Sequence, residues 1–146
     1  MGKLTELLQD TARRDELIAD LAEMVEEYVS DRGGFRGITL RTGLAAVKRK
    51  LPDAIPRTVT RLLPEFLAAL EPLHDRAKAR NGEDFARFLK KDRTLVAETM
   101  MGIADTRVER STNAGVKGFY ARFRSTAEHE AEEIVPGLAD VLARHL

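Results

Sequence analysis

Apolar residues recur every three or four positions along most of the chain, and this spacing predicts an α-helical protein. In the first long segment the apolar stripe alternates with acidic positions, which places the two kinds of residue on opposite faces of one helix. Gly33 and Gly34 should end this helix, because glycine closes a helix in the left-handed conformation at little cost. The stripe consists of Leu17, Ile18, Leu21, Met24, Val25, Tyr28 and Val29.

A second helix is predicted to begin near residues 35–37 and to end at Leu51, because the residue before Pro52 avoids helical geometry. Gly43 is expected to be a point of close packing inside it. The stretch "DRGGFRGITLRTG" lacks the residue order of a P-loop or a dinucleotide-binding loop. Its glycines therefore indicate helix boundaries rather than a phosphate site. The apolar stripe of this helix consists of Leu40, Leu44, Val47 and Leu51.

The most apolar segment follows, and it predicts a central core helix. Asp53 is a plausible N-cap for it. Pro64 and Pro72 lie deeper in the segment, where each removes a backbone hydrogen bond, so a kink or break is expected near each. The repeating apolar positions are Ile55, Val59, Leu62, Leu63, Phe66, Leu67, Leu70 and Leu73.

Beyond a loop expected at residues 79–84, further helical pieces are predicted. "FARFLKK" should form a short helix with its phenylalanines and leucine inward, and Asp92 should cap the next helix. Ser111 or Thr112 should cap the last long helix, which Pro136 and the glycine after it should interrupt. No segment alternates with a period of two. The predicted fold class is therefore all-α, a compact bundle of five to seven helical segments with a proline-kinked central helix.

Composition narrows the class of protein. The 146 residues suit a single domain over residues 1–146, and 43% hydrophobic with 33% charged residues excludes a disordered chain. The absence of cysteine excludes disulfides and thiolate chemistry. No apolar run is long enough for a transmembrane segment, and no signal peptide opens the chain. A cytoplasmic location is expected.

The net charge is zero, but the charges are unevenly distributed. Residues 1–31 carry nine acids against three bases, whereas residues 32–61 carry eight bases against one acid. Two explanations stay open: a basic surface for an anionic partner, or pairing of the basic segment with the acidic first helix, which we favour. The candidate anion- or partner-binding residues, here called the basic set, are Arg36, Arg41, Lys48, Arg49, Lys50, Arg57 and Arg61.

Catalytic and metal motifs are weak. Glu71 and His74 have the Glu-x-x-His spacing of di-iron bundles, but such sites need a second copy, and neither His129 nor His145 supplies one. None of the serines lies in a G-x-S-x-G elbow. We therefore expect a non-enzymatic protein with no cofactor, no metal and no catalytic residue.

Binding is the function class that remains. The main prediction is a helical interaction module with a protein partner or with itself as a homodimer. One alternative is a carrier of a small apolar ligand between the kinked helices. The other is a binder of an anionic surface through residues 36–61. Nucleic acid is disfavoured, because the chain is not basic overall and shows no helix-turn-helix. The expected pocket lining is Phe66, Met100, Met101, Phe119 and Phe123.

The assembled pattern resembles a family of small bacterial proteins known only as a domain of unknown function. The similar features are the helix from "DELIADLAEM", the glycine stop, the "AAVK" helix, the proline-punctuated "LLPEFLAALEP" segment and the later "IADTRVERS". The resemblance covers nearly the whole chain. It implies a free-standing helical domain, and it assigns no activity and no functional residue.

Overall fold

The computed structural model describes residues 3–79 and 84–146, and this part of the chain forms seven α-helices and no strand. The all-α prediction is confirmed, whereas the loop expected at residues 79–84 falls largely outside the described residues. The helices are α1 (Lys3–Glu6), α2 (Thr11–Asp31), α3 (Gly34–Lys50), α4 (Ala54–Ala79), α5 (Phe85–Lys91), α6 (Arg93–Glu109) and α7 (Ala114–Arg144).

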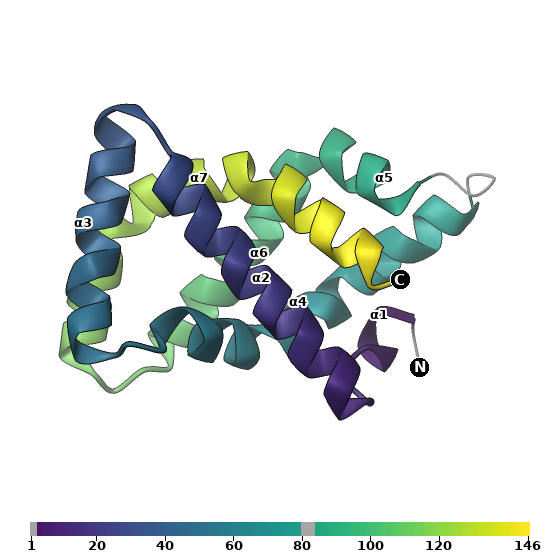
Figure 1. Cartoon of the computed structure of the whole chain (residues 1–146), viewed down its shortest axis with the longest axis horizontal. Helices are drawn as coiled ribbons and strands as arrows, with labels where there is room; N and C mark the ends of the chain where they lie inside the picture. Colours follow the sequence, from purple (N-terminus) through teal and green to yellow (C-terminus); the bar gives the residue numbers. More distant parts are fainter. Residues whose placement is uncertain (1–2, 80–83) are drawn as a thin grey trace.

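Two long helices organise the bundle. α7 packs against α2, α5 and α6, and α4 packs against α1, α2, α5 and α6. α3 and α5 lie toward opposite ends of the longest axis of the molecule, and the C-terminal end of α7 lies toward the α5 end (Figure 1). α3 packs chiefly against α2, so it has the fewest neighbours of the long helices.

The hydrophobic core is built by every helix except α3. The phenylalanines and the leucine of α5 are buried, as the sequence predicts. In α3 the only buried residue is Gly37. The core therefore occupies the part of the molecule away from α3. Its most completely enclosed side chains are Leu4, Leu7, Leu17, Leu67, Leu70, Leu89, Val96, Val135 and Leu142.

The connection between α2 and α3 explains the glycine-rich stretch. Gly34 begins α3 with a φ of 73°, in the left-handed region that favours glycine. Gly37 lies against the end of α2, where an added Cβ would be 1.8 Å from the carbonyl oxygen of Arg32. The predicted helix stop is confirmed, and a close approach of two backbones accounts for Gly37.

The prolines do not break their helices. α4 continues through Pro64 and Pro72, and α7 continues through Pro136, so the predicted interruption of α7 is wrong. Buried side chains flank the prolines, for example Leu63 and Val135. Tertiary packing on both sides outweighs the loss of one backbone hydrogen bond. Whether α4 bends at its prolines stays a prediction.

The caps follow the predictions only in part. Asn113 caps α7 by accepting a hydrogen bond from the Val116 amide at 3.2 Å. Ser111 and Thr112 do not cap this helix, because the Ser111 hydroxyl accepts a bond from the amide of Asn113 in the preceding turn. Asp92 precedes α6 without a side-chain capping bond to the helix.

Candidate functional site

An apolar cavity of about 370 Å³ lies between α2, α3, the first turns of α4 and the first half of α7. Most of its lining side chains are aliphatic or aromatic, and the polar ones are three threonines, Thr39, Thr58 and Thr126. The apolar side chains that define its walls are Val29, Leu40, Leu44, Ile55, Phe119 and Phe123.

The α3 wall of the cavity comes from the predicted apolar stripe. Leu40, Leu44 and Val47 line the cavity, and all three are half-buried rather than enclosed in the core. Gly43 lies between them, and an added Cβ there would meet only the ring of Phe123, at 3.9 Å. The close packing expected at Gly43 is therefore wrong, since this is an ordinary contact distance beside open space.

The α7 wall is aromatic. The rings of Phe119 and Phe123 lie 4.5 Å apart between centroids and are tilted by 33°. Phe119 is 44% exposed, so this wall reaches the surface. A ligand in the cavity would contact these rings on one side and the aliphatic stripe of α3 on the other.

The cavity does not lie where the sequence predicts. Phe119 and Phe123 line it, but Phe66 and Met101 are buried in the core, and Met100 packs against the core. The α4 residues that line the cavity all precede Pro64. The segment around the prolines is instead covered by neighbouring helices, because its leucines fill the core.

Two members of the basic set have structural partners at the α2–α3 hairpin. The Arg41 guanidinium donates a hydrogen bond to the carbonyl of Arg32 at 2.7 Å, which caps the end of α2. Lys48 forms an ion pair with Glu26 of α2. The favoured pairing of the basic segment with the acidic helix is therefore present, but it rests on this one pair between α2 and α3 among the described residues.

The rest of the basic set faces solvent. Arg57 pairs with Asp53 at 3.1 Å, one turn earlier on the same helix-forming segment. The remaining side chains are exposed, and within residues 3–79 and 84–146 they form no ion pair or hydrogen bond. They are Arg36, Arg49, Lys50 and Arg61.

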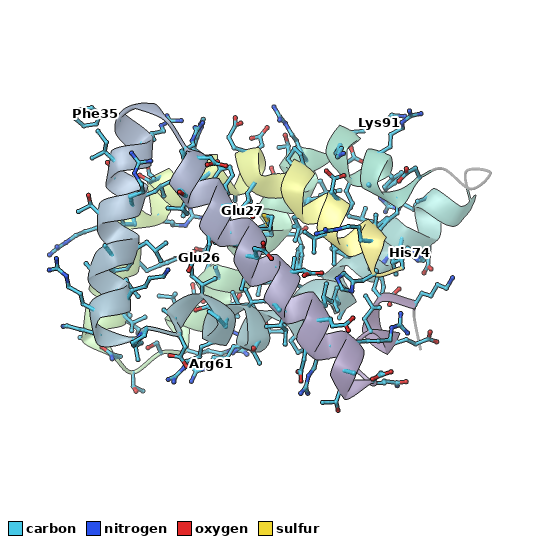
Figure 2. All side chains as sticks on the ribbon, in the orientation of Figure 1. Glu26, Glu27, Phe35, Arg61, His74 and Lys91 are labelled. Atoms are coloured by element: carbon cyan, nitrogen blue, oxygen red, sulfur yellow. The ribbon has the colours of Figure 1, made fainter. Side chains whose placement is uncertain are left out.

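Arg36 and Lys50 lie at the two ends of the cavity wall. Arg36 precedes Leu40 by four residues and Lys50 follows Val47 by three, so both share the face of α3 that lines the cavity. Arg61 points away from the bundle (Figure 2). Two cations with no acidic partner therefore flank the apolar surface.

A buried polar cluster ties α2 to α7 beside the cavity. Glu130 of α7 is 6% exposed, accepts a hydrogen bond from the Tyr28 hydroxyl and lies 3.1 Å from Nε of Arg32. Burial, together with the bond to Glu130, raises the pKa of Tyr28 well above its usual value. The hydrogen bond to Glu130 also raises the pKa of Arg32. The cluster therefore holds the end of α2 against α7 through one carboxylate that contacts both Tyr28 and Arg32.

A second cluster ties α7 to α6 behind the aromatic wall. The Arg124 guanidinium makes two bonds to the carboxylate of Asp105, at 2.7 and 2.9 Å, and the Tyr120 hydroxyl donates to it at 2.6 Å. The bond from Arg124, followed by that from Tyr120, lowers the pKa of Asp105 to about 2. Burial, followed by the bond to Asp105, raises the pKa of Tyr120 to about 12.

Neither cluster is predicted from the sequence, and no local motif could have revealed them. Tyr28 and Glu130 are 102 positions apart, and Asp105 and Tyr120 lie on different helices. The residues of each cluster are ordinary surface types that only the packing of helices brings together. Both clusters fix the position of α7 and leave the lining of the cavity apolar.

Taken together, the fold and site define an all-α protein with a ligand-sized apolar cavity between four helices. The chain belongs to a family of unknown function (DUF6918), whose model matches residues 4–146. The resemblance to a domain of unknown function is confirmed, whereas a bacterial origin stays a prediction. No curated protein and no solved structure matches the chain. In the part that the structure describes, none of the helices combines the length and apolar character needed to cross a membrane.

Proposed function

We propose that this protein binds a small apolar ligand in the cavity between α2, α3, α4 and α7. The observation that carries the proposal is the cavity itself, about 370 Å³ with an aliphatic and aromatic lining. Small-molecule sites are typically roughly 300–1,000 Å³ and predominantly apolar. An apolar ligand would restore the dispersion contacts that the lining side chains lack.

The charges at the ends of the α3 wall indicate the class of ligand. Arg36 and Lys50 have no acidic partner among the described residues and flank the apolar stripe. A ligand with an apolar chain and a negatively charged end, such as a fatty acid, would match both features. A carboxylate beside exposed cations gains a modest interaction, so the apolar chain supplies most of the affinity.

The experiment is a calorimetric titration with dodecanoate, with the neutral dodecanol as the comparison ligand. Gly43→Leu fills the cavity from its α3 wall, so we expect dodecanoate affinity to fall by at least about tenfold, which corresponds to about 1.4 kcal/mol. Gly118→Leu is the matched control, because an added Cβ at Gly118 meets nothing within 4 Å and this residue does not line the cavity. This control should bind as the original protein does.

The outcomes separate the cavity from the charges. Equal loss in both leucine variants, or no binding by the original protein, contradicts the proposal. Replacing both Arg36 and Lys50 by glutamine should remove the preference for dodecanoate over dodecanol and leave dodecanol binding unchanged. If dodecanol binds as tightly as dodecanoate to the original protein, the ligand is apolar without a required negative end.

The second candidate function is that of an interaction module that associates with itself. A cytoplasmic location belongs to this candidate. The interaction module is favoured by two apolar side chains on α3 that project from the surface, Phe35 at 89% exposure and Ile38 at 58%. Figure 2 shows Phe35 at the outer tip of the α2–α3 hairpin. Sedimentation of the calorimetry samples distinguishes the candidates: a dimer unaffected by dodecanoate supports the module, and a monomer at every concentration contradicts self-association.

A further inference from the structure

A cluster of metal-ligating side chains lies at the end of the molecule opposite the cavity. Glu71, His74 and Asp75 follow one another at the spacing i, i+3 and i+4, which places them on one face of α4. One ligand atom from each lies within 4.8 Å of the other two. Figure 2 shows His74 toward the end of the molecule that lies away from α3. We propose that these three residues bind one divalent transition-metal ion of the zinc class.

One of the two oxygens of the Glu71 carboxylate is hydrogen-bonded within the fold, and the other has no partner among the described residues. Its Oε1 accepts hydrogen bonds from the Thr5 amide at 2.8 Å and from the Thr5 hydroxyl at 3.3 Å, which anchors α1 to α4. Its other oxygen, Oε2, is buried and has no hydrogen-bond partner within residues 3–79 and 84–146. A buried carboxylate oxygen without a partner is costly, and a bound cation would remove that cost.

The imidazole of His74 is held in place by packing. His74 is 6% exposed, and its ring meets the ring of Phe85 edge to face, with centroids 5.0 Å apart and planes at 84°. α4, which carries this residue, packs against both α1 and α5. Burial of this ligand lowers the local dielectric constant on its side of the site, which strengthens the attraction between a cation and the ligand. Asp75 is exposed and provides the route from solvent.

The donor set selects the metal. One imidazole nitrogen and two carboxylates suit zinc and similar first-row divalent ions, which bind such ligands at about 2.0–2.2 Å. Magnesium and calcium prefer sets made of oxygen alone. The side chain of Asp75 is exposed, so it can rotate toward an ion held by Glu71 and His74, and a fourth coordination position stays open to water.

This site differs from the di-iron arrangement weighed in the sequence. A di-iron site needs a second Glu-x-x-His motif, whereas a single ion needs only a third ligand beside Glu71 and His74. Asp75 is that ligand. The cluster shares no residue with the lining of the cavity, so the metal proposal and the proposed function can fail separately.

The test is calorimetric titration of the tag-free protein with zinc chloride, combined with native mass spectrometry for stoichiometry. We expect one zinc per chain and no competition from excess magnesium. Asp75→Asn should weaken binding by at least about tenfold, since loss of even an outer partner of a metal ligand weakens affinity about 10–100-fold. Asp75 is exposed, so circular dichroism should show an unchanged fold.

The control is Asp31→Asn, the same change at an exposed aspartate near the far end of α2. It should bind zinc as the original protein does. In proton NMR, zinc should shift the imidazole signals that disappear in His74→Gln. The proposal would be overturned if Asp75→Asn still bound zinc as tightly as the original protein, or if less than one zinc bound per chain. It would also be overturned if zinc shifted only the imidazole signals of His129 and His145.

Discussion

The two ends of the bundle are packed in different ways. At the end that holds α5, leucines from several helices interlock, and side chains such as Leu67 and Leu89 are fully enclosed. At the α3 end, Leu40, Leu44 and Val47 are only half-buried and line a cavity. Apolar residues recur at helical spacing at both ends, so this spacing alone does not make a close-packed core.

The difference lies in side-chain volume. α3 has the sequence GFRGITLRTGLAAVKRK, which contains three glycines and two alanines and only a few large apolar residues. Gly43 lines the cavity beside the ring of Phe123 and supplies no side chain to fill the space. α4 presents a leucine or phenylalanine at nearly every inward position. Large residues on facing helices produce close packing, and small ones leave room.

The largest expected contrast comes from shortening one leucine at each end. Leu67→Ala empties a fully enclosed site and should lower the free energy of unfolding by about 3–5 kcal/mol. Leu44 already borders the cavity, so Leu44→Ala should lower the free energy of unfolding by only about 1 kcal/mol. Urea denaturation measures both changes. Equal losses would show that the two ends are packed alike.

A smaller contrast comes from adding one methyl group to each of two glycines of α3. Gly37→Ala would put a Cβ 1.8 Å from the Arg32 carbonyl oxygen, so it should destabilise the protein by more than about 1 kcal/mol. Gly43→Ala meets only an ordinary contact and should stabilise the helix by up to about 1 kcal/mol. Thermal unfolding monitored by circular dichroism should show shifts of opposite sign. A loss at both positions would mean that α3 is tightly packed along its length.

The smallest effect concerns the polar support of the aromatic wall. The pKa of Asp105 falls from 3.8 to about 2 on folding, chiefly through its bond to Arg124. Between these pH values the unfolded chain binds more protons, so this stabilisation is present above about pH 4 and is lost as the pH falls toward 2. Asp105→Asn should lower the free energy of unfolding by at most about 1 kcal/mol at neutral pH. It should also reduce the loss of stability between about pH 4 and pH 2, here called the acid limb.

Acid titration of the unfolding free energy checks this prediction. Glu128→Gln is the control, because it removes a more exposed i,i+4 partner of Arg124, at 3.2 Å, and leaves Asp105 in place. The control should keep the acid limb of the original protein. If Asp105→Asn leaves the acid limb unchanged, other carboxylates cause the loss of stability at low pH.

Much of the helical framework could be predicted from the chain alone. The stop at Gly33 and Gly34, the end of α3 before Pro52 and the inward face of α5 all depend on residues within a turn or two of one another. The failed interruption at Pro136 shows the limit of this reasoning. The cost of one lost hydrogen bond is local, but the packing that outweighs it comes from helices distant in the sequence.

The candidate site was accessible to sequence reasoning only in pieces. Phe119 and Phe123 are predicted as pocket residues, and both line the cavity. The pocket is expected near the prolines of α4, whereas it lies before them, beside α3. Arg41 belonged to the basic set, and only the fold shows that it caps α2. The spacing of Glu71 and His74 was visible in the chain, whereas the burial of the Glu71 oxygen was not.

The sequence by itself determined which segments are helical, which of their residues recur at helical spacing, and several of the helix ends, because these properties follow from neighbours about one turn apart. The tertiary structure decided which apolar faces meet, where volume is missing and which charges find partners. These outcomes depend on side chains brought together from distant helices, as Gly43 and Phe123 are at the cavity and Asp105 and Arg124 are behind it.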